Sequence, residues 1–280
     1  MRIKTDVVIV GTGVAGMFSA LKLPRDKKIV IITKEDMRSS DSFLAQGGIC
    51  VLRDENDYDS YFEDTMKAGH YENRKESVDI MIRGSRDIIN DLVGYGVDFK
   101  MDGDDFAYTR EGAHSRPRIL YHEDITGKEI SEKLLQQVLK LDNVTILEYT
   151  TMQDILVENG KCAGLKAVSA EGNRDRLKAM EAGNAVKIQE EIQPGGEIQV
   201  EIYAQDTILA SGGIGGRYAP STNYPHLTGD ALDIAKKHNV RLEHLDYVQI
   251  HPTTLYSKRP GRRFLISESV RGEGAVLYNS

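Results

Sequence analysis

The hydrophobic pattern at the start of the chain predicts a strand, a helix and a second strand. Residues 6–10 form a run that is continuously β-branched from Val7 to Val10, which is typical of a strand buried on both faces of a parallel sheet. A glycine-rich turn follows, and then a helical pattern over residues 17–23 that Pro24 ends. Residues 28–33 form the second apolar run. This order predicts a βαβ unit.

The middle of the chain predicts helices separated by irregular stretches. Apolar residues recur with helical spacing over residues 58–68, 76–93 and 127–140. Residues 37–45 show no helical period and are predicted as a loop. Residues 101–122 are mostly polar, and we expect them to be irregular.

The second half of the chain predicts mainly strands. Residues 143–149 and 153–169 are predicted as strands of a β-meander, and residues 197–209 as a further strand. The charged, glycine-bearing stretch 171–196 is expected to be a solvent-exposed excursion, either a hairpin or a short helix. A helix is predicted at residues 229–238.

Composition and charge exclude several classes of protein. The 280 residues are 40% hydrophobic and 28% charged, which is ordinary for a globular protein with a sizeable core. The formal net charge is −7 with acids and bases interspersed, so we expect neither a nucleic-acid partner nor membrane association. No apolar run approaches the ~20 residues of a membrane span, and the N-terminus has no signal region. We therefore expect a cytoplasmic protein.

The two cysteines, Cys50 and Cys162, are far apart and lack CxxC spacing. A disulfide framework or a structural zinc site is not expected, and no metal site is predicted. Each cysteine is better interpreted as a small buried hydrophobe than as a reactive thiol.

The turn after the first strand has the GxGxxG pattern of a dinucleotide site. The first glycine permits a tight turn, the second lets the backbone approach a pyrophosphate, and the third lets helix and strand pack closely. The helix N-terminus then offers N–H groups and partial positive charge to the phosphates. The candidate residues are Gly11, Thr12, Gly13, Val14, Ala15 and Gly16.

The end of the second strand departs from the usual NAD pattern. An acidic residue usually binds the ribose hydroxyls there, but this chain has Thr33 followed by Lys34, with Glu35 as the nearest acid. The adenosine end of a cofactor must be held differently, and we include Lys34 among the candidate cofactor residues.

Five further motifs follow in order, at residues 41–49, 210–213, 226–230, 251–253 and 267–274. Together they resemble the superfamily of fumarate reductase, succinate dehydrogenase and L-aspartate oxidase flavoproteins. The resemblance implies FAD as the cofactor. The cofactor residues that it implies are Asp41, Ser42, Phe43, Leu44, Ala45, Gln46, Gly47, Gly48, Gly212, Gly213 and Asp230. Members with covalent FAD carry a histidine at the position of Asp41, so the resemblance implies non-covalent FAD.

Residues 110–115, 118–120 and 124–127 resemble the L-aspartate oxidase branch. In that branch a glutamate at the position of Glu111 faces the amino group of the substrate. His251 and Ser267, which stands where threonine is common, are expected to bind substrate carboxylates. Glu268 and Arg271 are expected to carry protons to a catalytic arginine beyond residue 280.

The resemblance implies oxidation of L-aspartate to iminoaspartate, with oxygen or fumarate as electron acceptor. The product would pass to quinolinate synthase in the synthesis of NAD. Three alternatives remain: a soluble fumarate reductase or succinate-oxidising flavoprotein, a nicotinamide-dependent reductase, and a chain that binds FAD without catalysing a reaction.

The expected fold is α/β with two domains. Residues 1–245 are expected to form a Rossmann-like FAD-binding domain, with a parallel central sheet and an added β-meander. Residues 246–280 are expected to begin an α+β capping domain that the chain leaves unfinished, so we expect the 280-residue chain alone to be inactive.

Overall fold

The computed structural model describes residues 1–184, 186, 192, 194–251, 253–266, 275, 276 and 278. The chain divides into two compact units, each built from two stretches of sequence. The first unit contains Met1–Phe43 and Leu134–Phe264, and the second contains Leu44–Lys133 and Leu265–Ser280. The boundary predicted near residue 245 falls inside the first unit, and the two-domain division stays a prediction.

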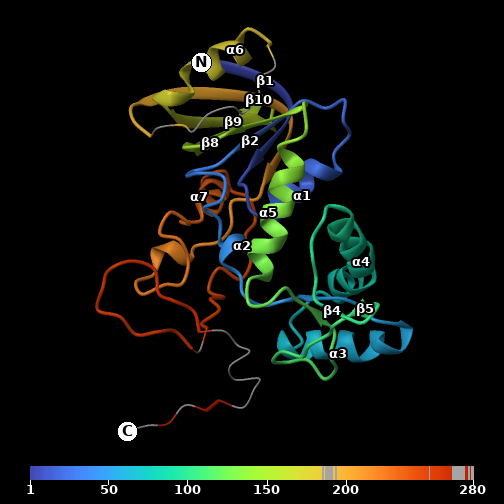
Figure 1. Ribbon diagram of the computed structural model, residues 1–280. Helices are drawn as coiled ribbons and strands as arrows, with labels where there is room; N and C mark the ends of the chain where they lie inside the picture. The colour runs from blue at the N-terminus through green and yellow to red at the C-terminus, as the bar shows by residue number, and fades with distance from the viewer. Residues whose placement is uncertain are drawn as a thin grey trace. The chain divides into compact units, whose positions relative to one another are not determined.

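The first unit is built on a six-stranded sheet (Figure 1). The strand order is β7 (Val144–Leu147), β2 (Ile29–Ile32), β1 (Arg2–Val10), β10 (Glu197–Leu209), β9 (Lys161–Ala170) and β8 (Thr150–Glu158). The first four strands pair in parallel. Strand β9 then pairs antiparallel with β10, and β8 pairs antiparallel with β9. The predicted parallel sheet with an added meander is confirmed.

The position predicted for residues 143–149 is wrong. They form β7, which is not a strand of the meander but the parallel neighbour of β2 at the opposite edge of the sheet. Helix α5 (Thr126–Val138) precedes β7 and supplies the crossover that a parallel pairing requires. The stretch after β9 contains the 3-10 turn η2 (Glu171–Asn173) and the short helix α6 (Arg174–Glu181), so the helix alternative is confirmed there.

The central strands are buried on both faces, as their continuous apolar runs predict. On one face Val8 belongs to a core cluster with Leu177 of α6 and Ile234 of α7 (Asp230–Lys237). On the other face Ile9 lies beneath Gly16 of α1 (Val14–Lys22), where a Cβ would be 3.3 Å from its side chain. Alternate residues of one strand therefore pack against helices on opposite sides of the sheet.

The second unit has its own small core between α3 (Tyr58–Ala68) and α4 (Lys75–Gly94), which includes the fully buried Ile82. Two expectations of irregular structure were incomplete. The stretch 37–45 contains the short helix α2 (Asp41–Leu44), and the stretch 101–122 contains the hairpin β4 (Met101–Asp102) and β5 (Asp105–Phe106). It also contains β6 (Ile119–Leu120), which pairs with β3 (Ile49–Cys50). Elements this short carry no detectable period.

Two 3-10 turns complete the described elements, η1 (Glu55–Asp57) before α3 and η3 (Gly215–Arg217) before α7. None of the helices in the described parts of the chain has the length and apolar character needed to cross a bilayer.

Candidate functional site

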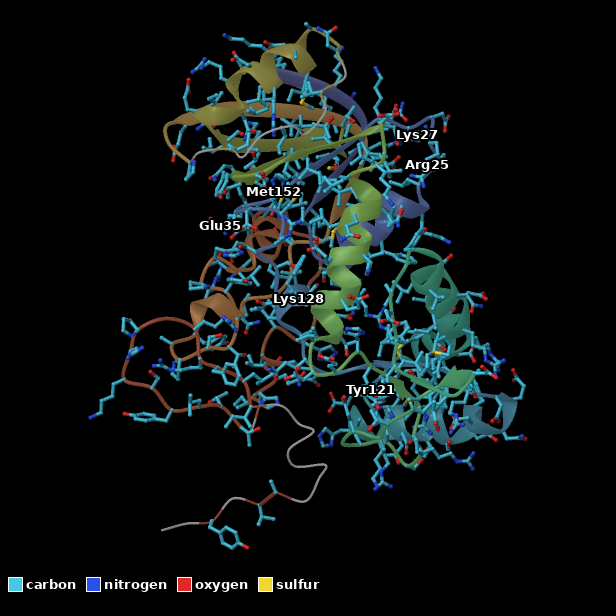
Figure 2. The ribbon with its side chains drawn as sticks, in the orientation of Figure 1. Arg25, Lys27, Glu35, Tyr121, Lys128 and Met152 are labelled. Carbon is cyan, nitrogen blue, oxygen red and sulfur yellow. The ribbon has the colours of Figure 1, made fainter. Side chains whose placement is uncertain are left out.

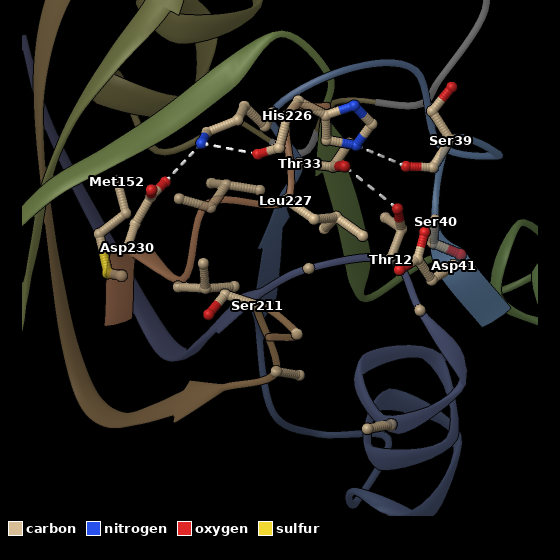
Figure 3. Close-up of a pocket in the computed structure, with 18 of the residues that line it drawn as sticks. Thr12, Thr33, Ser39, Ser40, Asp41, Met152, Ser211, His226, Leu227 and Asp230 are labelled. Atoms are coloured by element: carbon tan, nitrogen blue, oxygen red, sulfur yellow. Dashed lines mark hydrogen bonds and ion pairs between the residues drawn. The ribbon is translucent and has the colours of Figure 1, made fainter. Parts of the chain in front are cut away.

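The first unit contains a cavity of about 290 Å³ at the carboxyl ends of its parallel strands (Figure 3). The turn after β1, the ends of β2 and β10 and the segment before α7 line it. Met152 of β8, whose side chain is labelled in Figure 2, also lines it. Ligands of open α/β sheets bind at this edge. The cavity brings together these predicted cofactor residues: Gly11, Thr12, Gly13, Val14, Ala15, Lys34, Asp41, Ser42, Gly212, Gly213 and Asp230.

Close backbone packing shapes the turn after β1. Gly11 has φ of 111°, and a Cβ there would lie 2.3 Å from the carbonyl oxygen of Ala210. A Cβ on Gly16 would lie 2.0 Å from the carbonyl oxygen of Gly11, so α1 can approach β1 only with glycine at this position. Gly13 is the N-cap of α1, and the first turn of that helix has no acidic residue. The Val14 N–H donates to the Ser42 hydroxyl at 3.1 Å, but no acidic side chain competes with an anion for the positive end of α1.

Lys34 stands where a ribose-binding acid is usual. Its Nζ lies 2.7 Å from Oδ2 of Asp230 and donates to the Thr228 hydroxyl at 2.8 Å. Burial would raise the pKa of Asp230, but the hydrogen bonds from Lys34 and Thr228 outweigh it and hold that pKa below its usual range. The Thr12 hydroxyl donates to Thr33 Oγ1 at 3.1 Å (Figure 3). The cavity therefore offers hydroxyls and a neutralised ion pair in place of a lone carboxylate.

Asp41, at the start of α2, binds the segment that precedes α7. Its carboxylate accepts hydrogen bonds from the side-chain amide of Asn223 and from the N–H of Tyr224, the latter at 3.1 Å. Next to them, Nε2 of His226 donates to the carbonyl oxygen of Ser39 at 2.8 Å (Figure 3). The Asp41 carboxylate is thus engaged by the protein itself, and it holds one wall of the cavity against another.

In the second unit Glu111 lies against the loop of Gln46, Gly47 and Gly48. The N–H of Gly48 donates to Oε1 of Glu111 at 3.1 Å, and Oε2 lies 3.4 Å from the position of a Cβ on Gly47. Gln46 donates from Nε2 to the carbonyl oxygen of Leu265 at 3.3 Å. The buried Oε1 of Gln46 has no hydrogen-bond partner among the described residues. The structure thus brings together two predicted motifs that lie 63 residues apart.

Arg118 organises the same region, although no role was expected for it from the sequence. Its side chain is 0% exposed and forms ion pairs with Asp57 at 2.9 Å and Asp64 at 2.6 Å. In the sequence, the two acids are seven residues apart, a spacing that places side chains on the same side of a helix. No local pattern shows that an arginine so far along the chain lies between them.

The remaining predicted residues divide into two groups. Phe43 and Leu44 are half-buried on α2, and the carbonyl oxygen of Ala45 accepts from the N–H of Gly127 at 3.0 Å. The His251 ring contacts the backbone of Thr253, with Nδ1 3.0 Å from its oxygen. The others lie outside the described residues, and their roles stay predictions: Ser267, Glu268 and Arg271. Within the described part of the chain, no group of three or more His, Cys, Asp or Glu residues could hold a metal ion.

Comparison with known proteins assigns the fold to a family. Residues 6–280 match the sequence family described as FAD binding domain. The chain belongs to this FAD-binding family. The resemblance to flavoproteins and the α/β fold are confirmed, and the cofactor of the family is FAD.

Individual relatives agree with this assignment. L-aspartate oxidase of Clostridium perfringens is 41% identical over 280 residues, which are 100% of this chain and 58% of the relative. L-aspartate oxidase of Clostridium acetobutylicum is 40% identical, covering 100% of this chain and 59% of the relative. The solved structure of E. coli quinol fumarate reductase FrdA has a TM-score of 0.85 at 27% identity, covering 100% of this chain and 44% of that chain.

The residues around the cavity fit the phosphates and hydroxyls of FAD. The buried hydroxyl of Ser40 lines the cavity and has no hydrogen-bond partner in the described part of the chain. A Cβ on Gly13 would crowd the Ser42 hydroxyl at 3.2 Å, whereas glycine leaves the backbone at the start of α1 bare, as the approach of a pyrophosphate requires. An unpaired buried hydroxyl and a side-chain-free cradle are what a polar ligand would complete.

Proposed function

We propose that this protein is an L-aspartate oxidase, which converts L-aspartate to iminoaspartate with FAD. The carboxylate of Glu111 beside Gly47 and Gly48 is the observation that supports this activity best. The chain spans 58% and 59% of the two clostridial relatives, and the proposal concerns the activity of the whole protein.

Glu111 is suited to bind an ammonium group. The Gly48 N–H occupies Oε1 and fixes the orientation of the carboxylate, which leaves Oε2 for a second donor. A charge-assisted hydrogen bond from a substrate ammonium is roughly twice as strong as a neutral one. Succinate and fumarate have no such group, so this contact would favour aspartate over them.

The other roles follow from the chemistry of the side chains. We propose that His251 and Ser267 bind the substrate carboxylates, and that Glu268 and Arg271 hold and transfer the proton. The backbone of Gln46, Gly47 and Gly48 would contact the flavin ring. FAD, when bound, accepts the hydride, while these residues orient the substrate and supply charge.

The wider setting is also proposed. Oxygen or fumarate would reoxidise the flavin, and quinolinate synthase would use the product on the route to NAD. Among the described residues the site carries no feature that requires a nucleic acid or a membrane, and we propose a cytoplasmic location.

A soluble fumarate reductase is the alternative, and its support is the close match to the fumarate reductase fold. That enzyme would bind a dicarboxylate without an ammonium group. Glu111 would then have no substrate partner and would serve only to brace the Gly48 loop.

Glu111→Gln separates the two functions, because glutamine keeps an acceptor for Gly48 and removes the charge. Losing a charged hydrogen bond costs about 1.5–3 kcal/mol, so kcat/KM for aspartate should fall about 10- to 150-fold. Fumarate reduction should change much less. Glu123→Gln, which removes an exposed charge, is the matched control and should leave both activities unchanged. Equal losses for both substrates in Glu111→Gln would make Glu111 a structural residue.

A further inference from the structure

Every N–H group of the Arg118 guanidinium has an acceptor. Nε donates to Asp57 Oδ2 at 3.1 Å, and Nη2 donates to Asp57 Oδ1 and the Ser60 hydroxyl, both at 2.9 Å. Nη1 donates to Asp64 Oδ2 at 2.6 Å and to Nδ1 of His114 at 3.0 Å. Because arginine has five N–H donors in a fixed fork, this set of contacts determines where each partner lies.

The carboxylates around Arg118 are held in their charged form. Burial would raise the pKa of Asp57 and of Asp64, but hydrogen bonds from Arg118, with others from Ser60 and Ser115, outweigh it and hold both below their usual range. The side chain of Asp57 is 2% exposed and that of Asp64 is 15% exposed. Solvent therefore screens these ion pairs little, and they can define a rigid geometry.

The residues bound to Arg118 border the loop that carries Glu111. Ser115 donates from its N–H and its hydroxyl to Asp64, at 2.7 and 2.8 Å. On the same, C-terminal side of Glu111, β6 starts directly after Arg118 and pairs with β3, which starts directly after Gly48. The network thus connects the base of the Glu111 loop to the strand that follows the Gly48 contact.

His114 has a defined tautomer in this network. A guanidinium can only donate, so Nδ1 of His114 is the acceptor and the ring proton lies on Nε2. Nε2 then donates to Sγ of Cys50 at 3.4 Å. Burial and the charge of Arg118 both lower the pKa of His114, which keeps the ring neutral.

The turn between Glu111 and His114 is strained. Ala113 has φ of 68°, a left-handed conformation that costs a residue with a side chain about 1–2 kcal/mol. The N–H of His114 bonds the carbonyl oxygen of Glu111 at 3.3 Å. A strained turn persists only where neighbouring contacts hold it in place. Here these are the contacts of the His114 ring with Arg118 on one side and Cys50 on the other.

We infer that Arg118 and His114 are positioning residues, which hold Glu111 against Gly48 in the orientation that recognises the substrate ammonium. The inference rests on the proposed function for its kinetic consequence. The contact between Glu111 and Gly48 can be measured without any substrate, so the positioning role has its own test.

The kinetic experiment compares His114→Leu with His114→Asn in the intact, FAD-loaded protein. Leucine removes the acceptor for Arg118, whereas the Oδ1 of asparagine can take the place of Nδ1. His114→Leu should lower kcat/KM for aspartate at least tenfold, chiefly through KM, and lower fumarate reduction less than threefold. His114→Asn should stay within threefold of wild type for both substrates. A parallel fall in both activities, or equal effects of leucine and asparagine, would overturn the inference.

The second measurement is amide hydrogen exchange at Gly48. His114→Leu should speed exchange of this N–H at least tenfold, His114→Asn should not, and Ile82 in the nearby core should stay protected in both. Unchanged exchange at Gly48, or equally faster exchange at Ile82, would show that His114 only stabilises the fold. Wild-type protein that does not oxidise aspartate would refute the proposed function, and the exchange data would still decide the positioning role.

Discussion

Gly16→Ala tests whether the close packing of α1 on β1 shapes the cofactor cavity. The added Cβ would lie 2.0 Å from the carbonyl oxygen of Gly11 and 3.3 Å from the Ile9 side chain. Ordinary contact begins at 3.4 Å, so the start of α1 must move by roughly 1.4 Å. The neighbour is backbone at the end of a buried strand, which cannot turn aside as a flexible side chain would.

Two magnitudes follow from this displacement. Overpacking a well-packed site lowers the free energy of unfolding by about 1–3 kcal/mol. A loss of about 2 kcal/mol should lower the Tm of a protein of this size by roughly 4–8 °C. The displaced helix end should also lose one charge-assisted hydrogen bond to the pyrophosphate, worth about 1.5–3 kcal/mol. The affinity for FAD should therefore fall about 10- to 150-fold.

Gly84→Ala is the matched control. Gly84 lies inside α4, and a Cβ there would meet nothing within 4 Å. The same substitution should stabilise the protein by up to about 1 kcal/mol and leave FAD affinity unchanged. Thermal unfolding and titration of flavin fluorescence measure both quantities. A Gly16→Ala variant with the Tm of the wild type and an FAD affinity within twofold of the wild-type value would refute this prediction.

Three further predictions concern charge and the cofactor. Asp57→Asn should lower the free energy of unfolding by about 3–5 kcal/mol, since it leaves buried Arg118 without its main counter-charge; an unshifted urea midpoint would contradict this. The hydrogen bond from Lys237 is the main cause that lowers the pKa of Asp154 from 3.8 to about 2. A carboxylate whose pKa is lower in the folded state stabilises the fold at pH values above its unfolded-state pKa. This stabilisation is lost as the pH falls through its folded-state pKa. Asp154→Asn should therefore lower the free energy of unfolding by about 1 kcal/mol at pH 7, after allowance for solvent screening. Urea titrations should show this difference from wild type shrinking as the pH falls from 4 toward 2. Because Asp41 cannot form a histidyl–flavin bond, acid or heat should release all FAD into the supernatant, and flavin in the precipitate would show a covalent link.

Long periodic segments could be predicted closely from the sequence. Helix α3 and strand β10 have the bounds that their apolar spacing predicts, residues 58–68 and 197–209. Shorter elements could not be predicted, because α2 has four residues and β3 has two. Strand β7 was recognised as a strand but assigned to the wrong part of the sheet, since a strand pattern carries no information about its neighbour.

The sequence by itself determined the features that depend on nearby residues. The turn from Gly11 to Gly16 is one, because positive φ and close helix packing are demands that glycine alone meets at those positions. Only the tertiary structure decided the partners of the charged side chains. Lys34 bonds Thr228 across 194 residues and Arg118 bonds Asp57 across 61 residues. Such pairs form because the order of strands and the course of the loops bring them together, and no local period records that order.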